Sequence, residues 1–119
     1  MPQRTIQEFR EERLEGQERV LALEHLGVKR FFALDTAAYR DGDLSARTKE
    51  MCGLAASMVL RCNDCIDYHV EQCVKHGWSK AEIVEVFNVA LIVGGSIVIP
   101  HLRHATATLE QLLEEQTEK

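Results

Sequence analysis

The sequence predicts an all-α fold, a single compact bundle of about six helices over residues 1–119, with residues 1–26 as an N-terminal helical extension. Three observations support this prediction. Seven glycines and two prolines are few for the turns that many short strands would need. Apolar residues, 45% of the chain, recur mostly at helical spacing, without convincing strand alternation. A chain of 119 residues can bury one core and is too short to divide into two domains.

The N-terminal part is polar, with apolar residues at loosely helical spacing. We expect one helix from about Gln3 to Leu26, interrupted at Gly16 and stopped at Gly27, since glycine is common just after a helix. A second short helix is predicted from Val28 to Tyr39. The extension is expected to pack on a neighbouring subunit or to cap the core, with a solvated arm as the alternative.

The third predicted helix begins after Ser45, a plausible N-cap, and continues to about Leu60. Its later part, residues 51–60, is apolar nearly all round, which is typical of a helix buried on most of its faces. Cys52 lies in this run and is expected to be an inert, buried thiol.

Three further helices are predicted in the second half of the chain. The first covers about residues 63–76 and stops at Gly77. Ser79 and Glu82 form a capping box that begins the next helix, which continues to about Val93. The run 97–99 is β-branched and could form helix or strand. The last helix begins near Pro100, and its apolar face carries Leu102, Ala105, Leu109, Leu112 and Leu113.

Charge and hydropathy exclude several classes of function. The chain has 14 Lys and Arg against 19 Asp and Glu, a net charge of -5, and shows no basic excess for nucleic-acid binding. Its charged N-terminus lacks the apolar core of a signal peptide. The longest apolar stretch, Val89 to Pro100, is about half a membrane span. A cytoplasmic location without nucleic-acid or membrane partners is therefore expected.

Two cysteines and a histidine are predicted to share one helix face. Cys62 and Cys65 are three residues apart, and His69 follows Cys65 by four residues, about one turn. A helix N-terminus lowers the pKa of a thiol, and an imidazole one turn away can accept the thiol proton. Two thiols at this spacing can also close into a disulfide. The segment is a candidate for thiol redox chemistry.

Zinc binding is the main alternative for this cluster. A zinc site needs ligands that converge as a tetrahedron, usually from two separate elements. The candidate ligands all lie along one short helix: Cys62, Cys65, His69, Cys73 and His76. Because these cannot wrap around one ion, we expect no metal, and Ile66 after Cys65 excludes a c-type haem. Cys73 and His76 are expected to be packing or surface residues.

Glu50 stands twelve residues before Cys62, in the early turns of the apolar helix. A glutamate there is usually solvated and favoured by the helix dipole. Beside an apolar run it could instead be partly buried, where a carboxylate would need a partner such as a histidine. Spacing alone leaves both interpretations open.

The four residues Glu50, Cys62, Cys65 and His69 reproduce an E-x11-C-x2-C-x3-H pattern. In this the chain resembles the alkylhydroperoxidase D-like branch of the carboxymuconolactone decarboxylase family. Residues 76–83, HGWSKAEI, look like that family's next helix start, and the similarity covers about residues 44–107. The best-known members of the branch have histidine where this chain has Asp64, whose carboxylate would raise the pKa of the neighbouring thiol.

The resemblance implies an all-helical trimer or hexamer with thiol-dependent peroxidase or disulfide oxidoreductase activity and no metal or organic cofactor. It implies that Cys65 attacks a hydroperoxide and that Cys62 resolves the product as a disulfide. His69 would remove the Cys65 proton, with Glu50 orienting the histidine or relaying protons. The expected reductant is a lipoyl or thioredoxin-like protein, and the expected role is antioxidant.

Two other functions stay open from the sequence. A decarboxylase acting on a muconolactone-type acid is one, since the family includes it, although that branch does not rely on a C-x-x-C pair. The other is a non-enzymatic oligomer whose thiols sense redox state and regulate assembly.

Overall fold

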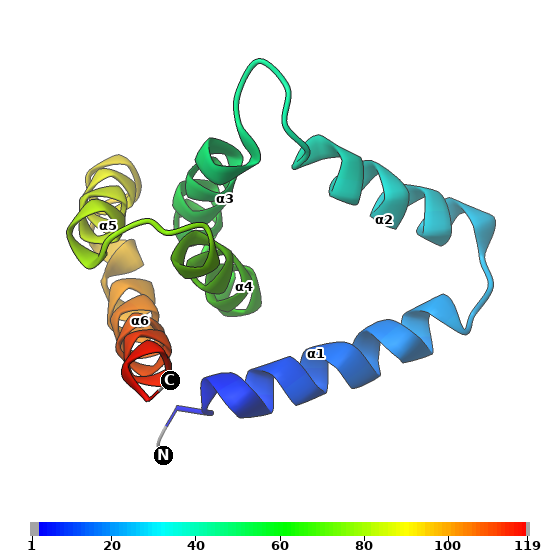
Figure 1. The fold of residues 1–119 in the computed structure, drawn as a ribbon, viewed down its shortest axis with the longest axis horizontal. Helices are drawn as coiled ribbons and strands as arrows, with labels where there is room; N and C mark the ends of the chain where they lie inside the picture. Colours follow the sequence, from blue (N-terminus) through cyan, green and yellow to red (C-terminus); the bar gives the residue numbers. More distant parts are fainter. Residues whose placement is uncertain (1–2, 119) are drawn as a thin grey trace.

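The computed structural model describes residues 3–118 of the protein. Within this range the chain forms six α-helices and one short 3-10 helix, with no strand (Figure 1). The elements are α1 (Ile6–Leu21), α2 (Leu26–Ala38), α3 (Ala46–Val59), α4 (Asn63–Lys75), α5 (Lys80–Gly94), η1 (Ser96–Val98) and α6 (Ile99–Thr117). The predicted all-α class is confirmed, and the run 97–99 belongs to η1 and the start of α6.

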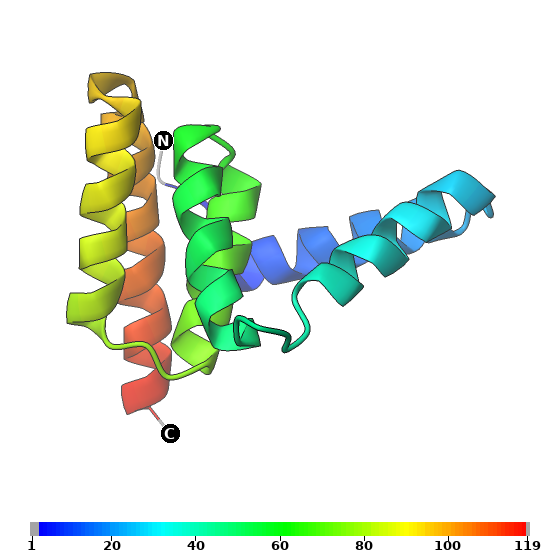
Figure 2. The same cartoon turned by 90° about the horizontal axis from the view of Figure 1, so that it is seen from above.

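Helices α3 to α6 pack into one group, and α1 and α2 extend away from it (Figures 1 and 2). We call residues 14–38 the arm. The start of α1 lies against the group, where Ile6 and Phe9 are buried in the core. Helix α2 forms the returning half of the arm and leads back to α3. It has no buried residue. The N-terminal extension therefore caps the core only with its first turns.

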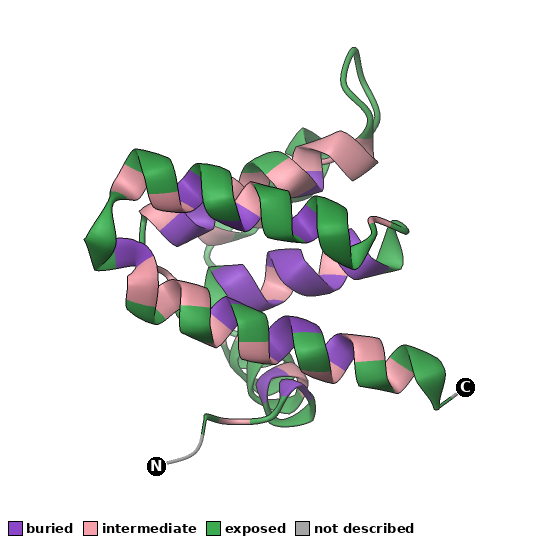
Figure 3. Ribbon diagram, turned by 90° about the vertical axis from the view of Figure 1, so that its left-hand side faces the viewer, coloured by how far each residue is buried: buried purple, intermediate pink, exposed green. Residues whose placement is uncertain are grey.

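The core lies between the facing sides of α3, α4, α5 and α6 (Figure 3). Its largest fully buried side chains include Leu54, Met58, Ile66, Ile83 and Leu109. Burial of apolar side chains from four helices fixes α3 against α4, and these are the two helices that carry the E-x11-C-x2-C-x3-H residues.

Helix starts follow the capping signals of the sequence. The Ser45 side chain accepts a hydrogen bond from the backbone N–H of Thr48 and caps α3. Ser79 and Glu82 form the predicted capping box at the start of α5. Between α4 and α5, Gly77 has a φ of 80°, which glycine adopts without the steric cost of a side chain. These predictions are confirmed.

Two predictions about the N-terminal glycines are wrong. Helix α1 continues through Gly16 and ends at Leu21, and Gly27 lies in the first turn of α2 instead of stopping α1. Glu24, with a φ of 54°, makes the reversal between the helices. His25 then caps α2, because its Nδ1 accepts a hydrogen bond from the Val28 N–H at 3.4 Å.

Cys52 is also not the buried thiol that the sequence predicts. It is exposed, because it lies on the side of α3 opposite the core-facing Leu54 and Met58. Leu60, two turns further along the same side, is 76% exposed. The apolar run 51–60 predicts burial on most faces, but within this chain one face of α3 is exposed.

Candidate functional site

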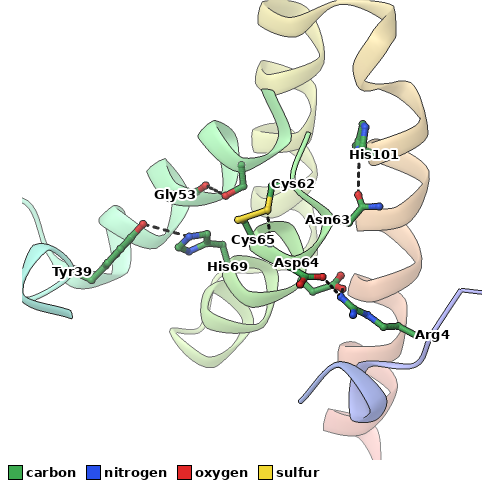
Figure 4. The surroundings of a disulfide bond; sticks show 11 residues. Arg4, Tyr39, Gly53, Cys62, Asn63, Asp64, Cys65, His69 and His101 are labelled. Carbon is green, nitrogen blue, oxygen red and sulfur yellow. Dashed lines mark hydrogen bonds and ion pairs between the residues drawn. A yellow bond between two sulfur atoms is a disulfide. The ribbon is translucent and has the colours of Figure 1, made fainter. Parts of the chain in front are cut away.

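The two cysteines of the C-x-x-C segment are joined by a disulfide at the start of α4 (Figure 4). Arg61, with a φ of 61°, turns the chain so that Cys62 becomes the N-cap of this helix. The Cys62 Sγ accepts a hydrogen bond of 3.2 Å from the Cys65 N–H. Cys65 is exposed, whereas Cys62 is half-buried. The pairing puts an accessible sulfur in the positive field of a helix N-terminus.

His69 and Glu50 form a buried pair behind the cysteines. His69 is 8% exposed and Glu50 is 4% exposed. The His69 Nδ1 lies 2.8 Å from the Glu50 Oε1, which joins α4 to α3. Of the two interpretations of Glu50, the structure supports the buried carboxylate with a histidine partner. An ionised carboxylate only accepts hydrogen bonds, so Nδ1 carries the proton of this contact.

Tyr39, at the C-terminal end of α2, contacts the other ring nitrogen of His69. Its hydroxyl lies 3.3 Å from Nε2 (Figure 4). Burial raises the pKa of Tyr39, and the negative charges of Glu50 and Asp35 raise it further. The phenol is therefore protonated at neutral pH and can donate to Nε2. Sequence analysis missed this residue, since nothing in the pattern links a tyrosine in one helix to a histidine 30 residues later.

Gly53, on α3, leaves the space in which this contact forms. A Cβ at this position would lie 2.7 Å from the His69 Cε1 and 2.8 Å from the Tyr39 hydroxyl oxygen. Both distances are far shorter than ordinary van der Waals contact. The absence of a side chain at residue 53 is thus a requirement of the His69–Tyr39 geometry, which the sequence pattern did not reveal.

A cavity of about 470 Å³ opens beside Cys65, between α4 and the two helices of the arm. Cys65, Tyr68 and His69 contribute from α4, and Tyr39 contributes from the end of α2. Helix α1 contributes Phe9, Arg13 and Val20 to the cavity wall. The cavity therefore gives a small organic molecule access to the cysteine and to the surroundings of the histidine, with aromatic and apolar groups on its walls.

Asp64, the residue where this chain departs from the best-known members of the resembling branch, is paired with an arginine. Arg4 forms an ion pair with Asp64, a second one of 2.7 Å with Glu12, and a longer contact of 3.4 Å with Asp67. An opposite charge beside a carboxylate offsets its field at neighbouring groups. Arg4 thus weakens the effect that the Asp64 charge exerts on the adjacent thiol.

Two histidines of α6 hold the first turns of α4, and sequence analysis did not single them out. The His101 Nδ1 lies 2.8 Å from the Asn63 Oδ1, and the His104 Nε2 lies 2.8 Å from the Oδ1 of buried Asp67. Thr108 donates a hydrogen bond of 2.6 Å to the same Asp67 oxygen. These contacts fix the orientation of the turn that carries the disulfide.

The remaining cluster residues lie outside this arrangement. Cys73 is buried beside Met51, and burial raises its pKa to about 12, which leaves it a poor nucleophile. His76 is the exposed C-terminal cap of α4. Both therefore are the packing and surface residues that were expected. Among residues 3–118, no group of three or more His, Cys, Asp or Glu side chains is arranged to hold a metal ion.

Over residues 3–118, no helix combines enough length with enough apolar character to cross a bilayer.

Comparison with known proteins identifies relatives over most of the chain. Residues 27–108 match the model of the carboxymuconolactone decarboxylase family. The uncharacterized protein 4 in the cox locus of Paracoccus denitrificans is 30% identical over 82 residues, which are 69% of this chain and 74% of that protein.

Solved structures from Thermotoga maritima are similar over nearly the whole chain. One crystal structure has a TM-score of 0.91 at 54% identity and covers 94% of this chain and 98% of its own. Another has a TM-score of 0.89 at 53% identity, with 93% and 94% coverage. The second is described as a carboxymuconolactone decarboxylase family protein with a suggested part in the antioxidative response.

Proposed function

Because the chain belongs to the carboxymuconolactone decarboxylase family, we propose that it is a thiol-dependent peroxidase that reduces hydroperoxides through Cys62 and Cys65. One observation carries this proposal: the Cys62–Cys65 disulfide opens onto a cavity that also contains His69, itself paired with Glu50. The suggested antioxidative part of the Thermotoga relative agrees with it.

The proposed reaction begins with the reduced pair. The Cys65 thiolate attacks an oxygen of the hydroperoxide, so that an S–O bond forms as the O–O bond breaks. Cys65 becomes a sulfenic acid, and the leaving alkoxide takes up the proton that the thiol gave up. The Cys62 sulfur then attacks the Cys65 sulfur, which forms the disulfide and releases water. The two electrons that reduce the peroxide come from the two cysteines.

An external dithiol must return the pair to its reduced form. It supplies two electrons and two protons and itself becomes a disulfide. Cys65 is the exposed partner and hence the sulfur that an incoming thiolate can reach. A lipoyl or thioredoxin-like protein fits this requirement, and the reducing conditions of the cytoplasm would favour it.

In this proposal His69 accepts the Cys65 proton, and Glu50 holds the imidazole in place and stabilises its charged form. The 2.8 Å contact between buried partners supports that division of roles. The cap of α4 also favours negative charge on the Cys62 sulfur, because the Cys65 N–H donates a hydrogen bond to the Cys62 Sγ.

We further propose that the protein functions as a homo-oligomer, a trimer or a hexamer. Phe31 and Leu34, both on α2, are 66% and 71% exposed, and α2 buries no residue within the chain. A second copy covering the arm would remove this apolar surface from water. Since the arm forms one side of the cavity, such contacts would also fix the shape of the site.

The direct test is consumption of an organic hydroperoxide by the purified protein with a dithiol reductant. We expect turnover by the wild type and no turnover by Cys65→Ser. Cys52→Ser is the matched control, because Cys52 is exposed but does not line the cavity, and it should keep the wild-type rate. Full activity in Cys65→Ser, or none in the wild type, would contradict the proposal.

A further inference from the structure

Most of the charged groups that line the cavity beside Cys65 neutralise one another. Arg4 forms ion pairs with Glu12 and with Asp64, and all three side chains lie on the cavity wall. Arg13 also lines the cavity, but its guanidinium forms no ion pair or hydrogen bond within the part of the chain that the structure describes. The cavity therefore contains a positive charge that no direct contact with these residues compensates.

The guanidinium of Arg13 is held over an aromatic ring next to the cysteine. Its Cζ lies 4.4 Å from the centroid of the Tyr68 ring, a cation–π contact between α1 and α4. Tyr68 follows Cys65 by three residues, so the two side chains share one face of α4, with their Cβ atoms about 5–6 Å apart. A guanidinium carries five N–H donors in a planar fork that matches a carboxylate, and the contact with the ring restricts its motion before a ligand arrives.

We propose that Arg13 binds the carboxylate of the substrate, an organic hydroperoxide that carries an acid group, an inference that rests on the proposed peroxidase function. With its carboxylate at Arg13, a small molecule can place its peroxide end at the Cys65 sulfur, about one helical turn away. The part of the molecule between these ends lies against Phe9 and Tyr68, which line the same cavity. A volume of about 470 Å³ accommodates a molecule of this size.

Asp35 contributes a charge of opposite sign to the same cavity. It lines the wall from α2, and its carboxylate forms no ion pair with any of residues 3–118. A negative charge there repels a substrate carboxylate, whereas direct contact with a guanidinium gives charge-assisted hydrogen bonds. Removal of the Asp35 charge should therefore strengthen the binding of an acid, and removal of the Arg13 charge should weaken it.

The test compares cumene hydroperoxide that carries a carboxylate at the para position with its methyl ester, which has nearly the same shape but no charge. We expect the wild-type kcat/KM to be about fivefold to tenfold higher for the acid, the effect of one charge-assisted contact at a partly exposed site. Arg13→Gln should bring the ratio of the two kcat/KM values close to one, and Asp35→Asn should increase it. Arg19→Gln is the matched control and should keep the wild-type ratio, because Arg19 is an exposed residue of α1 that does not line the cavity.

A second measurement does not depend on peroxide turnover. Alkylation of Cys65 by iodoacetamide is followed in the reduced protein with 4-isopropylbenzoate or its methyl ester present, and fragment mass spectrometry locates the modified residue. In the wild type, the carboxylate should protect Cys65 at a lower concentration than the ester does. In Arg13→Gln the two compounds should protect it equally.

The two proposals can fail separately. Equal kcat/KM values for the acid and the ester in the wild type, or a preference that Arg13→Gln leaves unchanged, would overturn the role of Arg13 and leave the peroxidase proposal standing. A lower preference for the acid in Asp35→Asn would also overturn it. Absence of turnover with both peroxides would instead overturn the peroxidase function, and selective protection by 4-isopropylbenzoate would then still support carboxylate binding at Arg13.

Discussion

Gly53 shows how a single residue without a side chain can determine the geometry of the site. In the middle of α3, alanine would normally be preferred over glycine by about 1 kcal/mol. Here an added methyl group would meet the imidazole of His69, which cannot move away without breaking its contact with Glu50. The steric effect therefore opposes the helix propensity and should exceed it.

We predict that Gly53→Ala lowers both stability and activity. Overpacking of this kind costs about 1–3 kcal/mol, which outweighs the propensity gain, and displacement of His69 should reduce peroxide turnover at least about tenfold. Urea denaturation and the peroxidase assay measure the two effects. Gly16→Ala is the matched control for stability, since a Cβ there meets nothing within 4 Å and should stabilise α1 by about 1 kcal/mol. Equal stabilisation by both substitutions would contradict this account.

At the scale of the helix, Cys62 has two structural tasks. It is one half of the disulfide, and its sulfur caps α4 by accepting the hydrogen bond from the Cys65 N–H. The second task does not need sulfur, because serine is among the preferred N-cap residues. The redox function and the capping function can hence be separated by substitution.

We predict that under reducing conditions Cys62→Ser is at least as stable as the wild type, whereas Cys62→Ala is less stable by about 1 kcal/mol. Neither variant can form the disulfide, so the comparison isolates the cap. Thermal unfolding followed by circular dichroism measures the difference. Equal midpoints for the serine and alanine variants would show that the cap does not stabilise α4.

The sequence predicts a helix boundary best where the residues that set the boundary are close together in the chain. The starts at Ser45 and Ser79 were predicted because a capping side chain bonds a backbone group three residues away. The end of α1 was not predicted correctly. The reversal after it uses Glu24 at a positive φ and His25 as an N-cap, and neither residue type is common at such a position. Local chemistry thus carried most of the helix assignment.

The site residues also differ in whether local spacing could predict their positions. Cys62, Cys65 and His69 share one helix, so their spacing alone predicted their proximity. Glu50 needed the packing of α3 on α4, and spacing left its burial open. Tyr39 depends on how the arm returns to the group of four helices, which no local pattern encodes.

Across the whole molecule, the arm stands out because none of its residues is buried within the chain. Helix α2 has 13 residues and none is buried, and an isolated helix of that length is marginal in water. Cys52 on α3 and Leu60, the residue that follows this helix, are exposed as well, so part of the apolar run 51–60 is not buried within the chain. Both observations are explained if further copies of the chain cover these faces.

We predict that wild-type protein sediments as a multiple of its 13.5 kDa chain mass and that Phe31→Glu with Leu34→Glu lowers this mass. Charges at an apolar contact between copies would be desolvated without partners. Lys29→Glu is the control, because it changes the net charge of α2 by the same amount and removes little apolar surface. A monomeric wild type, or equal masses for the variant and the wild type, would contradict the oligomer proposal.

If Cys65 is the sulfur that attacks the peroxide, its first oxidation product is a sulfenic acid that can be trapped before a disulfide forms. Cys62→Ser protein, fully reduced, is treated with less than one equivalent of hydroperoxide in the presence of dimedone, which captures sulfenic acids. We predict a dimedone adduct on Cys65 and none on Cys52 or Cys73. An adduct on Cys52 in place of Cys65, or no adduct while peroxide is consumed, would contradict it.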